Sequence, residues 1–350
     1  MEHEEIWHNI LEEIIKFNGS DILLTAEQQV KMRLDGELIA LKVPVITNDF
    51  MVRLVKALLK PAELRKMQAG SEIDFALVYK KRRFRGNAYY QQGKIALVLR
   101  LLPAYIPGFA QLHTPLALQR LITARQGMIL VCGRTGSGKT TTLASFLEAV
   151  NTNCQSHIIT LEDPIEYQYL PKKCFISQRE LGRDFTSFAT ALKSALRESP
   201  DVIMVGELRD FATLQVALAA AYSGVLLLGT LHSNSAIGTM LRLESLFPFN
   251  QQNSLRTQIA EVMTGIFAQE LIPAASGGRV CLTEVLLANS AVRNLIRQGK
   301  YNQLATVMLQ QKQGMQTKLK ALQNLANEGL IDKQTFAKYQ EIINDGGELG

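Results

Sequence analysis

The sequence contains few cysteines, no long uncharged hydrophobic run and no recognisable secretory leader. Its 4 cysteines are far apart among 350 residues and form no C-x-x-C pair, so neither a zinc site nor a disulfide framework is indicated. The longest apolar region, around residues 202–231, is interrupted by Glu207, Arg209 and Asp210, so no membrane-spanning helix is expected. The first residues are acidic, whereas a signal peptide is basic and then apolar. We therefore expect a cytoplasmic protein whose membrane contact is peripheral.

The overall composition is that of a globular protein with a mildly basic charge. Hydrophobic residues make up 47% of the chain, and 350 residues suit two domains with a core each. The net charge of +6 fits nucleic acid, an acidic membrane surface or an acidic protein partner equally well. The charge therefore selects none of these partners.

The first hundred residues alternate between helical and strand patterns. Apolar residues at helical spacing over 6–15 predict an opening helix. Residues 31–40 are expected to form a hairpin, with Asp35-Gly36 at its turn. A helix-rich stretch is expected over 49–68. Three further strands are predicted at residues 75–79, 83–90 and 95–102.

Two domains follow from these patterns. Residues 1–104 are predicted to form a small α+β domain, and the prolines of residues 105–116 indicate a linker. Residues 117–350 alternate between helices and short apolar strands, which predicts an α/β domain with a mostly parallel, RecA-like sheet. Its strands are expected at residues 128–132, 157–161, 202–205 and 224–231. The region after residue 289 is expected to be helical. A nucleotide bound by such a sheet lies at the carboxyl ends of the strands.

The octapeptide from Gly133 to Thr140, G-R-T-G-S-G-K-T, matches the phosphate-binding pattern G-x-x-x-x-G-K-[ST]. An apolar run precedes it and helical spacing follows it, which is the strand, loop and helix order that the motif needs. Glycines let backbone N–H groups face the phosphates, and the helix N-terminus adds partial positive charge. Lys139 is expected to reach the β- and γ-phosphates, and Thr140 to bind Mg²⁺. The predicted nucleotide contacts are Gly133, Thr135, Gly136, Ser137, Gly138, Lys139, Thr140 and Thr141.

A second predicted strand runs directly into acidic residues, in the sequence I-I-T-L-E-D-P-I-E that contains Glu162 and Asp163. Carboxylates at this position face the nucleotide crevice, and one within hydrogen-bond reach of the attacking water could orient or deprotonate it. For Asp163 an alternative is equally open. An aspartate before proline is also typical of a helix cap.

Two more predicted strands end on polar residues. The run V-I-M-V-G-E-L-R-D resembles a Walker B strand in which Gly206 replaces the usual aspartate, so the metal-facing carboxylate becomes Glu207. The run L-L-L-G-T-L-H-S-N-S places His232 where it could sense the γ-phosphate. The alternatives are a solvated turn acid for Glu207 and a structural hydrogen-bond donor for His232.

Taken together, the four strand-end motifs resemble the Walker A, Asp box, Walker B and His box of secretion-type ATPases. Within that superfamily the chain is most similar to the PilT branch, the hexameric retraction motors of type IV pili. Further matches are Q-R-E-L-G-R-D at 178–184, A-V-R-N-L-I-R at 291–297 and G-M-Q-T at 314–317. The resemblance implies a PAS-like N-terminal domain, a RecA-like ATPase domain and a ring of six subunits with ATP and Mg²⁺ at the interfaces.

The resemblance also implies residue roles. Glu162 would activate water, Glu207 would support the metal, and His232 would couple the γ-phosphate to ring geometry. Arginines from the neighbouring N-terminal domain complete such sites, and a basic run over 80–85 supplies candidates. Lys81, Arg83 and Arg85 would share one strand face, and Arg100 lies in the next strand. Planar guanidinium groups suit phosphate charge in a transition state, although a basic run near aromatic residues is also typical of nucleic-acid binding.

The function implied by the resemblance is a cytoplasmic hexameric ATPase that acts on a pilus platform protein in the inner membrane and drives retraction. Related extension motors usually carry a further N-terminal domain and a four-cysteine zinc site, neither of which this sequence contains. Other motor ATPases of the pilus are possible partners, and nucleic acid is not expected as one. Three alternatives are a pilus extension or type II secretion assembly ATPase, a nucleic-acid translocase, and a ring subunit that binds ATP with little hydrolysis.

Overall fold

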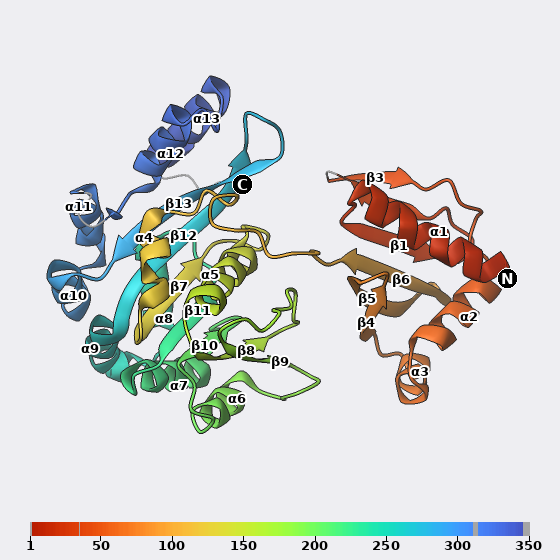
Figure 1. Cartoon of the computed structure of the whole chain (residues 1–350), viewed down its shortest axis with the longest axis horizontal. Coiled ribbons are helices and arrows are strands. Elements are labelled where there is room, and N and C mark those ends of the chain that lie inside the picture. The colour runs from red at the N-terminus through yellow and green to blue at the C-terminus, as the bar shows by residue number, and fades with distance from the viewer. Residues whose placement is uncertain (1, 35, 311–313, 346–350) are drawn as a thin grey trace. The chain divides into compact units, whose positions relative to one another are not determined.

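The computed structural model describes residues 2–34, 36–310 and 314–345 (Figure 1). The chain divides into two units, Met1–Tyr105 and Ile106–Gly350, each with its own core. Residues 106–116, expected as linker, fall in the second unit, where Ile106 and Phe109 pack against its core.

The first unit is a six-stranded antiparallel sheet with the order β3-β2-β1-β6-β5-β4. This is the α+β architecture predicted from the sequence, and the hairpin around residue 35 pairs as expected. Pro61 separates the helix-rich stretch into two helices, because proline starts a helix but cannot continue one. Its elements are α1 (Glu2–Phe17), β1 (Asp21–Thr25), β2 (Lys31–Leu34), β3 (Glu37–Ala40), α2 (Asn48–Leu58), α3 (Pro61–Gln68), β4 (Ile73–Tyr79), β5 (Arg82–Gln91) and β6 (Lys94–Leu101).

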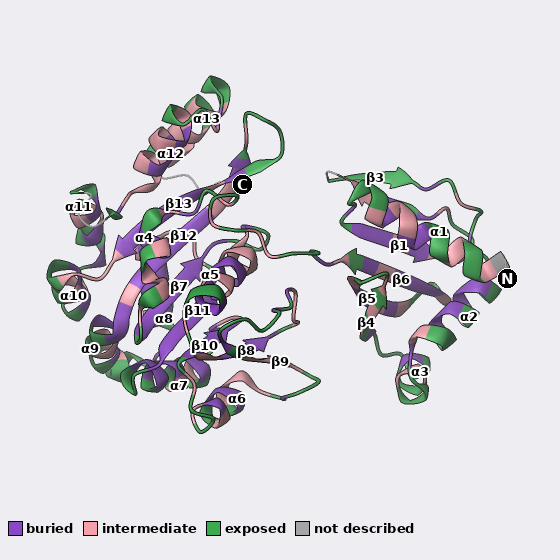
Figure 2. Cartoon of the chain, viewed as in Figure 1, coloured by how far each residue is buried: buried purple, intermediate pink, exposed green. Residues whose placement is uncertain are grey.

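The helices of the first unit bury one face of its sheet. Ile10 and Ile14 of α1 and Met51 of α2 are fully buried with Phe84 and Leu99 of the sheet. Figure 2 shows the buried strands of both units as purple arrows. Because side chains alternate along a strand, the residues next to Phe84 belong to the opposite face. That face carries the candidate arginines.

The second unit is built on a seven-stranded sheet with the order β13-β12-β7-β11-β10-β8-β9. Every neighbouring pair is parallel except β12 and β13, so the prediction of a mostly parallel sheet is confirmed. Its strands are β7 (Gly127–Cys132), β8 (His157–Glu162), β9 (Phe175–Glu180), β10 (Val202–Val205), β11 (Leu226–Leu231), β12 (Met263–Pro273) and β13 (Arg279–Leu287). The central strands β7, β10 and β11 are buried along their whole length.

Helices cover both faces of this sheet. One core packs α6 to α10 against it, and a second core on the other face holds α4 and α5. A third cluster joins the outer part of β12 and β13 to α12 and α13, which Figure 1 shows side by side. The helices are α4 (Leu116–Gln119), α5 (Lys139–Asn153), α6 (Phe188–Ala195), α7 (Phe211–Tyr222), α8 (Ala236–Ser245), α9 (Gln252–Val262), α10 (Ser290–Arg297), α11 (Leu304–Leu309), α12 (Lys318–Asn327) and α13 (Lys333–Asn344).

Two features differ from the sequence predictions. Strands β9, β12 and β13 were not predicted. Lys81 does not share a strand face with the arginines, since it lies with Lys80 in the β4–β5 turn, where both residues have positive φ. This two-residue turn suits the twist of the flanking strands. Among the described residues, no helix combines the length and the apolar character that a membrane span requires.

Candidate functional site

The phosphate-binding loop connects β7 to α5 and depends on glycine at its first position. Gly133 has φ 153°, and a Cβ atom there would lie 2.3 Å from Oγ of Ser137 and 2.4 Å from the carbonyl oxygen of Gln269. Gly138, the last residue before α5, has φ 87°, which glycine adopts without strain. The loop therefore has the close-packed, left-handed backbone that the sequence motif implies.

Two side chains hold this loop from inside. The Lys139 ammonium donates hydrogen bonds to the carbonyl oxygens of Gly133 at 2.8 Å and Arg134 at 2.9 Å. The buried amide of Gln269, on β12, donates to the carbonyl oxygen of Ser137 at 2.7 Å. Oγ of Ser137 is buried and has no hydrogen-bond partner among the described residues. A buried polar atom without a partner, beside a lysine at a helix N-terminus, fits a phosphate group as ligand.

Charged residues that follow the neighbouring strands act electrostatically on the loop. Burial lowers the pKa of the Lys139 ammonium, and the charges of Glu207 and Glu166 oppose that lowering. Thr141, two residues further along α5, shares a hydrogen bond of 3.0 Å with the hydroxyl of Tyr167. The structure thus brings the phosphate loop next to the segments that follow β8 and β10.

Glu162 is the last residue of β8, and its side chain is buried. It accepts hydrogen bonds from Oγ1 of Thr160 at 2.6 Å and from Nε2 of Gln178 at 3.1 Å. Burial raises the pKa of Glu162 to about 7, although the two donors oppose the rise. A carboxylate with such a pKa can accept a proton near neutral pH.

Asp163 does not cap a helix, so that alternative is wrong. Residues 165–170, which follow it, have no regular secondary structure. Its carboxylate instead lies 3.9 Å from the guanidinium of Arg209. The two helices that do start next to the site have other caps. Asp210 caps α7 through the N–H of Thr213, and Ser235 caps α8 through the N–H of Gly238.

Glu207 and His232 lie together at the ends of the adjacent strands β10 and β11. Oε1 of Glu207 is 3.4 Å from Nε2 of His232, and its other oxygen is 2.7 Å from Nε of Arg209. The Glu207 side chain is only 18% exposed and has two charged or polar partners. The alternative of a solvated turn acid is therefore wrong. His232 is 45% exposed and opens towards solvent beside this carboxylate.

The three candidate arginines lie on the first unit. Arg85 and Arg100 are register partners on β5 and β6, and Arg100 pairs in the same way with Asp21 of β1. Nε of Arg100 is 2.8 Å from the Asp21 carboxylate, and Nη2 of Arg85 is 3.5 Å from Asp74. Nη1 of Arg83 is buried without a hydrogen-bond partner among the described residues. The arginines thus form one cationic face of the antiparallel sheet.

Several contacts of the site were missed by sequence reasoning. Gln269 lies on a strand that was not predicted, and Gln178 was noted only as part of a matching segment. Tyr167, Glu166 and Arg209 stand within or beside recognised motifs, but no spacing rule singles them out. Only their position next to the predicted strand ends could have indicated that these residues belong to the site.

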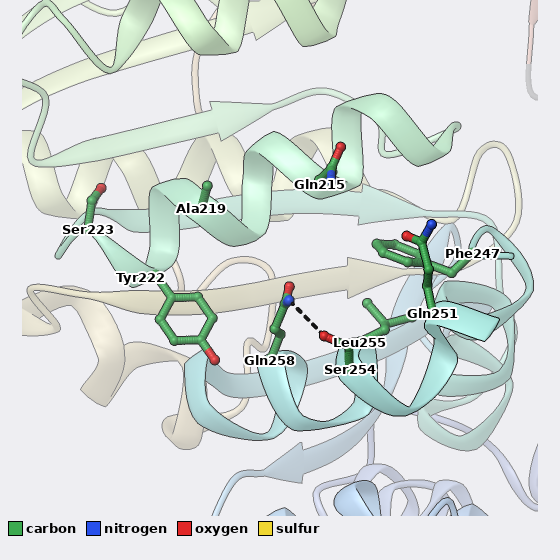
Figure 3. Close-up of a pocket in the computed structure, with 9 residues that line it drawn as sticks. All are labelled: Gln215, Ala219, Tyr222, Ser223, Phe247, Gln251, Ser254, Leu255 and Gln258. Carbon is green, nitrogen blue, oxygen red and sulfur yellow. Dashed lines mark hydrogen bonds between the residues drawn. The ribbon is translucent and has the colours of Figure 1, made fainter. Parts of the chain in front are cut away.

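A separate cavity of about 730 Å³ lies between α7 and α9 (Figure 3). Its lining is uncharged and includes Gln215 of α7, Gln258 of α9 and Gln251 of the short turn just before α9. No candidate residue lines it. We place the chemistry at the strand ends, because the ionisable groups and the glycine loop converge there.

Comparison with known protein families decides the assignment of the chain. The model of the family described as "Type II/IV secretion system protein" matches residues 2–338. The chain belongs to this family. A crystal structure of the pilus retraction motor PilT with bound ADP has a TM-score of 0.88 and 41% identity to it, and the match covers 94% of this chain and 95% of that one.

Curated relatives agree with this membership. The chain is 36% identical to the "Type IV pilus retractation ATPase PilT" of Pseudomonas aeruginosa, over 93% of this chain and 96% of the relative. It is 40% identical to the "Uncharacterized protein YggR" of Escherichia coli K12, over 91% of this chain and 97% of the relative. The chain is a PilT-like ATPase of the type II/IV secretion family, with a RecA-like core and an N-terminal α+β domain. The predicted family, fold class and enzyme class are confirmed.

Proposed function

We propose that this ATPase is a homohexameric motor that drives type IV pilus retraction. In this proposal ATP is hydrolysed at subunit interfaces on the cytoplasmic face of the membrane, and the work is done on the inner-membrane platform protein of the pilus. Other motor ATPases of the same pilus would be possible partners. The observation that carries the proposal is the convergence of Lys139, Glu207 and His232 with the buried Glu162 at one edge of a PilT-like core.

Glu162 is the proposed general base. Its carboxylate is buried at a strand end, and its pKa of about 7 suits proton transfer near neutral pH. The proton of the attacking water would pass to Glu162 as the oxygen attacks the γ-phosphorus and the bond to the β-phosphate oxygen breaks. His232 contacts Glu207 and is exposed, which supports a role in coupling the γ-phosphate to the neighbouring subunit.

Mg²⁺ fits the residues at the loop. This ion keeps several waters and takes only one or two protein oxygens together with substrate phosphates. Thr140 is in the first turn of α5, and the Glu207 carboxylate acts electrostatically on Lys139 next to it. No group of three or more His, Cys, Asp or Glu side chains that could hold a metal occurs among the described residues, which agrees with an ion held jointly with the nucleotide. Bound there, it would neutralise charge on the phosphates.

Arg83, Arg85 and Arg100 are the proposed trans-acting arginines. Each extends from the face of the antiparallel sheet that its own helices leave uncovered. Arg100 pairs with Asp21 and Arg85 pairs with Asp74, and these contacts hold both guanidinium groups at the surface of the sheet. From a neighbouring subunit, such groups would stabilise the charge that develops on the γ-phosphate.

The experiment is a chromosomal replacement of Glu162 by Gln, with the surface pili of each cell counted by electron microscopy. The purified variant is assayed in parallel for ATP binding and turnover. We expect retained ATP binding, lost turnover and an excess of pili. Bald cells would make the protein an extension or assembly motor. ATP turnover stimulated by DNA or RNA would favour a nucleic-acid translocase.

A further inference from the structure

Gln178 of β9 connects three segments around the proposed base. Its Nε2 donates to Oε1 of Glu162 at 3.1 Å and to the carbonyl oxygen of Tyr167 at 2.8 Å. Its Oε1 accepts the N–H of Tyr169 at 3.2 Å. An amide that satisfies three partners at once has a fixed orientation, so the donor that faces Glu162 is held by the backbone of the segment after β8.

The two donors to Glu162 reach the same oxygen. Oγ1 of Thr160, two residues earlier on β8, also donates to Oε1, at 2.6 Å. Among the hydrogen bonds of the described residues, none reaches Oε2 of Glu162. The carboxylate is therefore anchored through one oxygen, and neither of these two hydrogen bonds uses the other oxygen.

The same segment also reaches the nucleotide loop. The hydroxyl of Tyr167 lies 3.0 Å from Oγ1 of Thr141 on α5, whereas its carbonyl oxygen accepts from Gln178. Tyr167 is buried, and so is the side chain of Glu162. A continuous set of contacts thus runs from the helix of the phosphate loop through Tyr167 and Gln178 to Glu162.

We propose that Gln178 is a positioning residue for hydrolysis, which fixes Oε1 of Glu162 and leaves Oε2 to take the proton of the attacking water. This inference rests on the proposed role of Glu162 as the base. Among the described residues, the hydrogen bonds of Gln178 go to Glu162, Tyr167 and Tyr169 and none goes to the phosphate loop, so it acts through Glu162 and Tyr167. The amide favours the ionised carboxylate, because it donates a hydrogen bond to it.

Other charged groups near Glu162 act in the opposite direction. Glu166 follows β8, and Glu180 lies on β9 two residues beyond Gln178; both carboxylates disfavour ionisation of Glu162. Removal of the amide leaves burial and these two charges opposed by Thr160 alone. The pH at which Glu162 loses its proton must then rise.

The test replaces Gln178 by Met, which has similar length but no donor, and Thr160 by Val, which keeps the shape of threonine. Thr160→Ser retains the hydroxyl and serves as the matched control. The ATP turnover of each full-length variant is measured from pH 5.5 to 9. We expect the acidic limb of the profile to move up by about 1 pH unit in Gln178→Met and in Thr160→Val. Thr160→Ser should keep the limb of the unmodified protein.

Infrared difference spectra against Glu162→Gln then report the protonated carboxyl of Glu162 without catalysis. If both the infrared midpoint and the activity limb move, the inference holds. If turnover falls equally at every pH and the infrared midpoint stays, Gln178 is only structural and the inference is overturned. If the infrared midpoint moves but the activity limb stays, Gln178 controls the carboxylate as inferred, and the role of Glu162 as base is wrong.

Discussion

The side-chain amide of Gln269 donates a 2.7 Å hydrogen bond to the carbonyl oxygen of Ser137, a residue 132 positions earlier in the chain. The carbonyl oxygen of Gln269 would also lie only 2.4 Å from a Cβ atom on Gly133. The phosphate loop is therefore shaped by strand β12 as well as by its own glycines. Its geometry depends on a tertiary contact that the motif alone does not contain.

Replacement of Gln269 by Leu should loosen the loop. The substitution leaves the carbonyl oxygen of Ser137 without its buried donor, which costs about 1–3 kcal/mol. We expect a lower thermal unfolding temperature and a raised KM for ATP. Gln258→Leu is the control, since the side chain of Gln258 bonds, among the described residues, to Ser254 on its own helix. Equal effects of the two substitutions on KM would show that the Gln269 contact does not shape the loop.

Lys139→Ala should weaken ATP binding. The ammonium reaches the loop carbonyls of Gly133 and Arg134 from the first turn of α5, and from there it can reach the phosphates. A hydrogen bond to a charged group contributes about 1.5–3 kcal/mol, which corresponds to roughly 10- to 100-fold in Kd. Titration with a fluorescent ATP analogue measures the change, with the exposed Lys193→Ala as control. A Kd within twofold of the unmodified protein would contradict the assignment.

The buried carboxyl of Glu162 should make stability depend on pH. Its pKa rises from 4.5 in the unfolded chain to about 7 in the folded protein. Between these values the folded state binds the extra proton, so the free energy of unfolding falls as pH rises through this window. Glu162→Gln removes this pH dependence. Relative to that of the unmodified protein, its free energy of unfolding should therefore rise by roughly 3 kcal/mol as the pH is raised from 4.5 to 8. Denaturant unfolding at both pH values is the measurement.

The exposed Glu341→Gln is the matched control for that substitution, and it should show no such gain. A pH-independent difference between Glu162→Gln and the unmodified protein would mean that the pKa of Glu162 is the same in the folded and unfolded states. Its suitability as a base near neutral pH would then be lost.

The arginines should affect turnover more than nucleotide affinity. Alanine at Arg83, Arg85 or Arg100 is expected to reduce ATP turnover about 10-fold or more, because each substitution removes charge stabilisation supplied across a subunit interface. Arg33→Ala is the matched control, since Arg33 is the register partner of Asp21 on the same sheet face. Unchanged turnover in all three variants would refute the arginine assignment.

The sequence predicted the strand ends of the site well, and the physical reason is specific. Strands β7, β10 and β11 are buried along their whole length, so they appear as short apolar runs that end abruptly on Gly133, Glu207 and His232. Parallel strands place such ends at one edge. The positions of these residues therefore follow from the pattern and the class of fold.

The supporting residues could not be predicted in the same way. Gln178 lies on β9, an edge strand whose F-I-S-Q-R-E sequence is too polar to suggest a buried strand. Gln269 lies on β12, which begins at Met263 immediately after α9 ends at Val262, with no turn residues to mark the change of period. In both cases the functional contact is set by strand order and register, which a single sequence does not encode locally.

The most direct test of the motor proposal follows single labelled pili in living cells that carry Glu162→Gln in place of the native protein. The measured quantity is the fraction of extended filaments that shorten again. If the chain is a retraction motor, filaments will appear at the normal rate and almost none will shorten. Filaments that fail to appear, or that shorten as they do with the unmodified protein, would contradict the account.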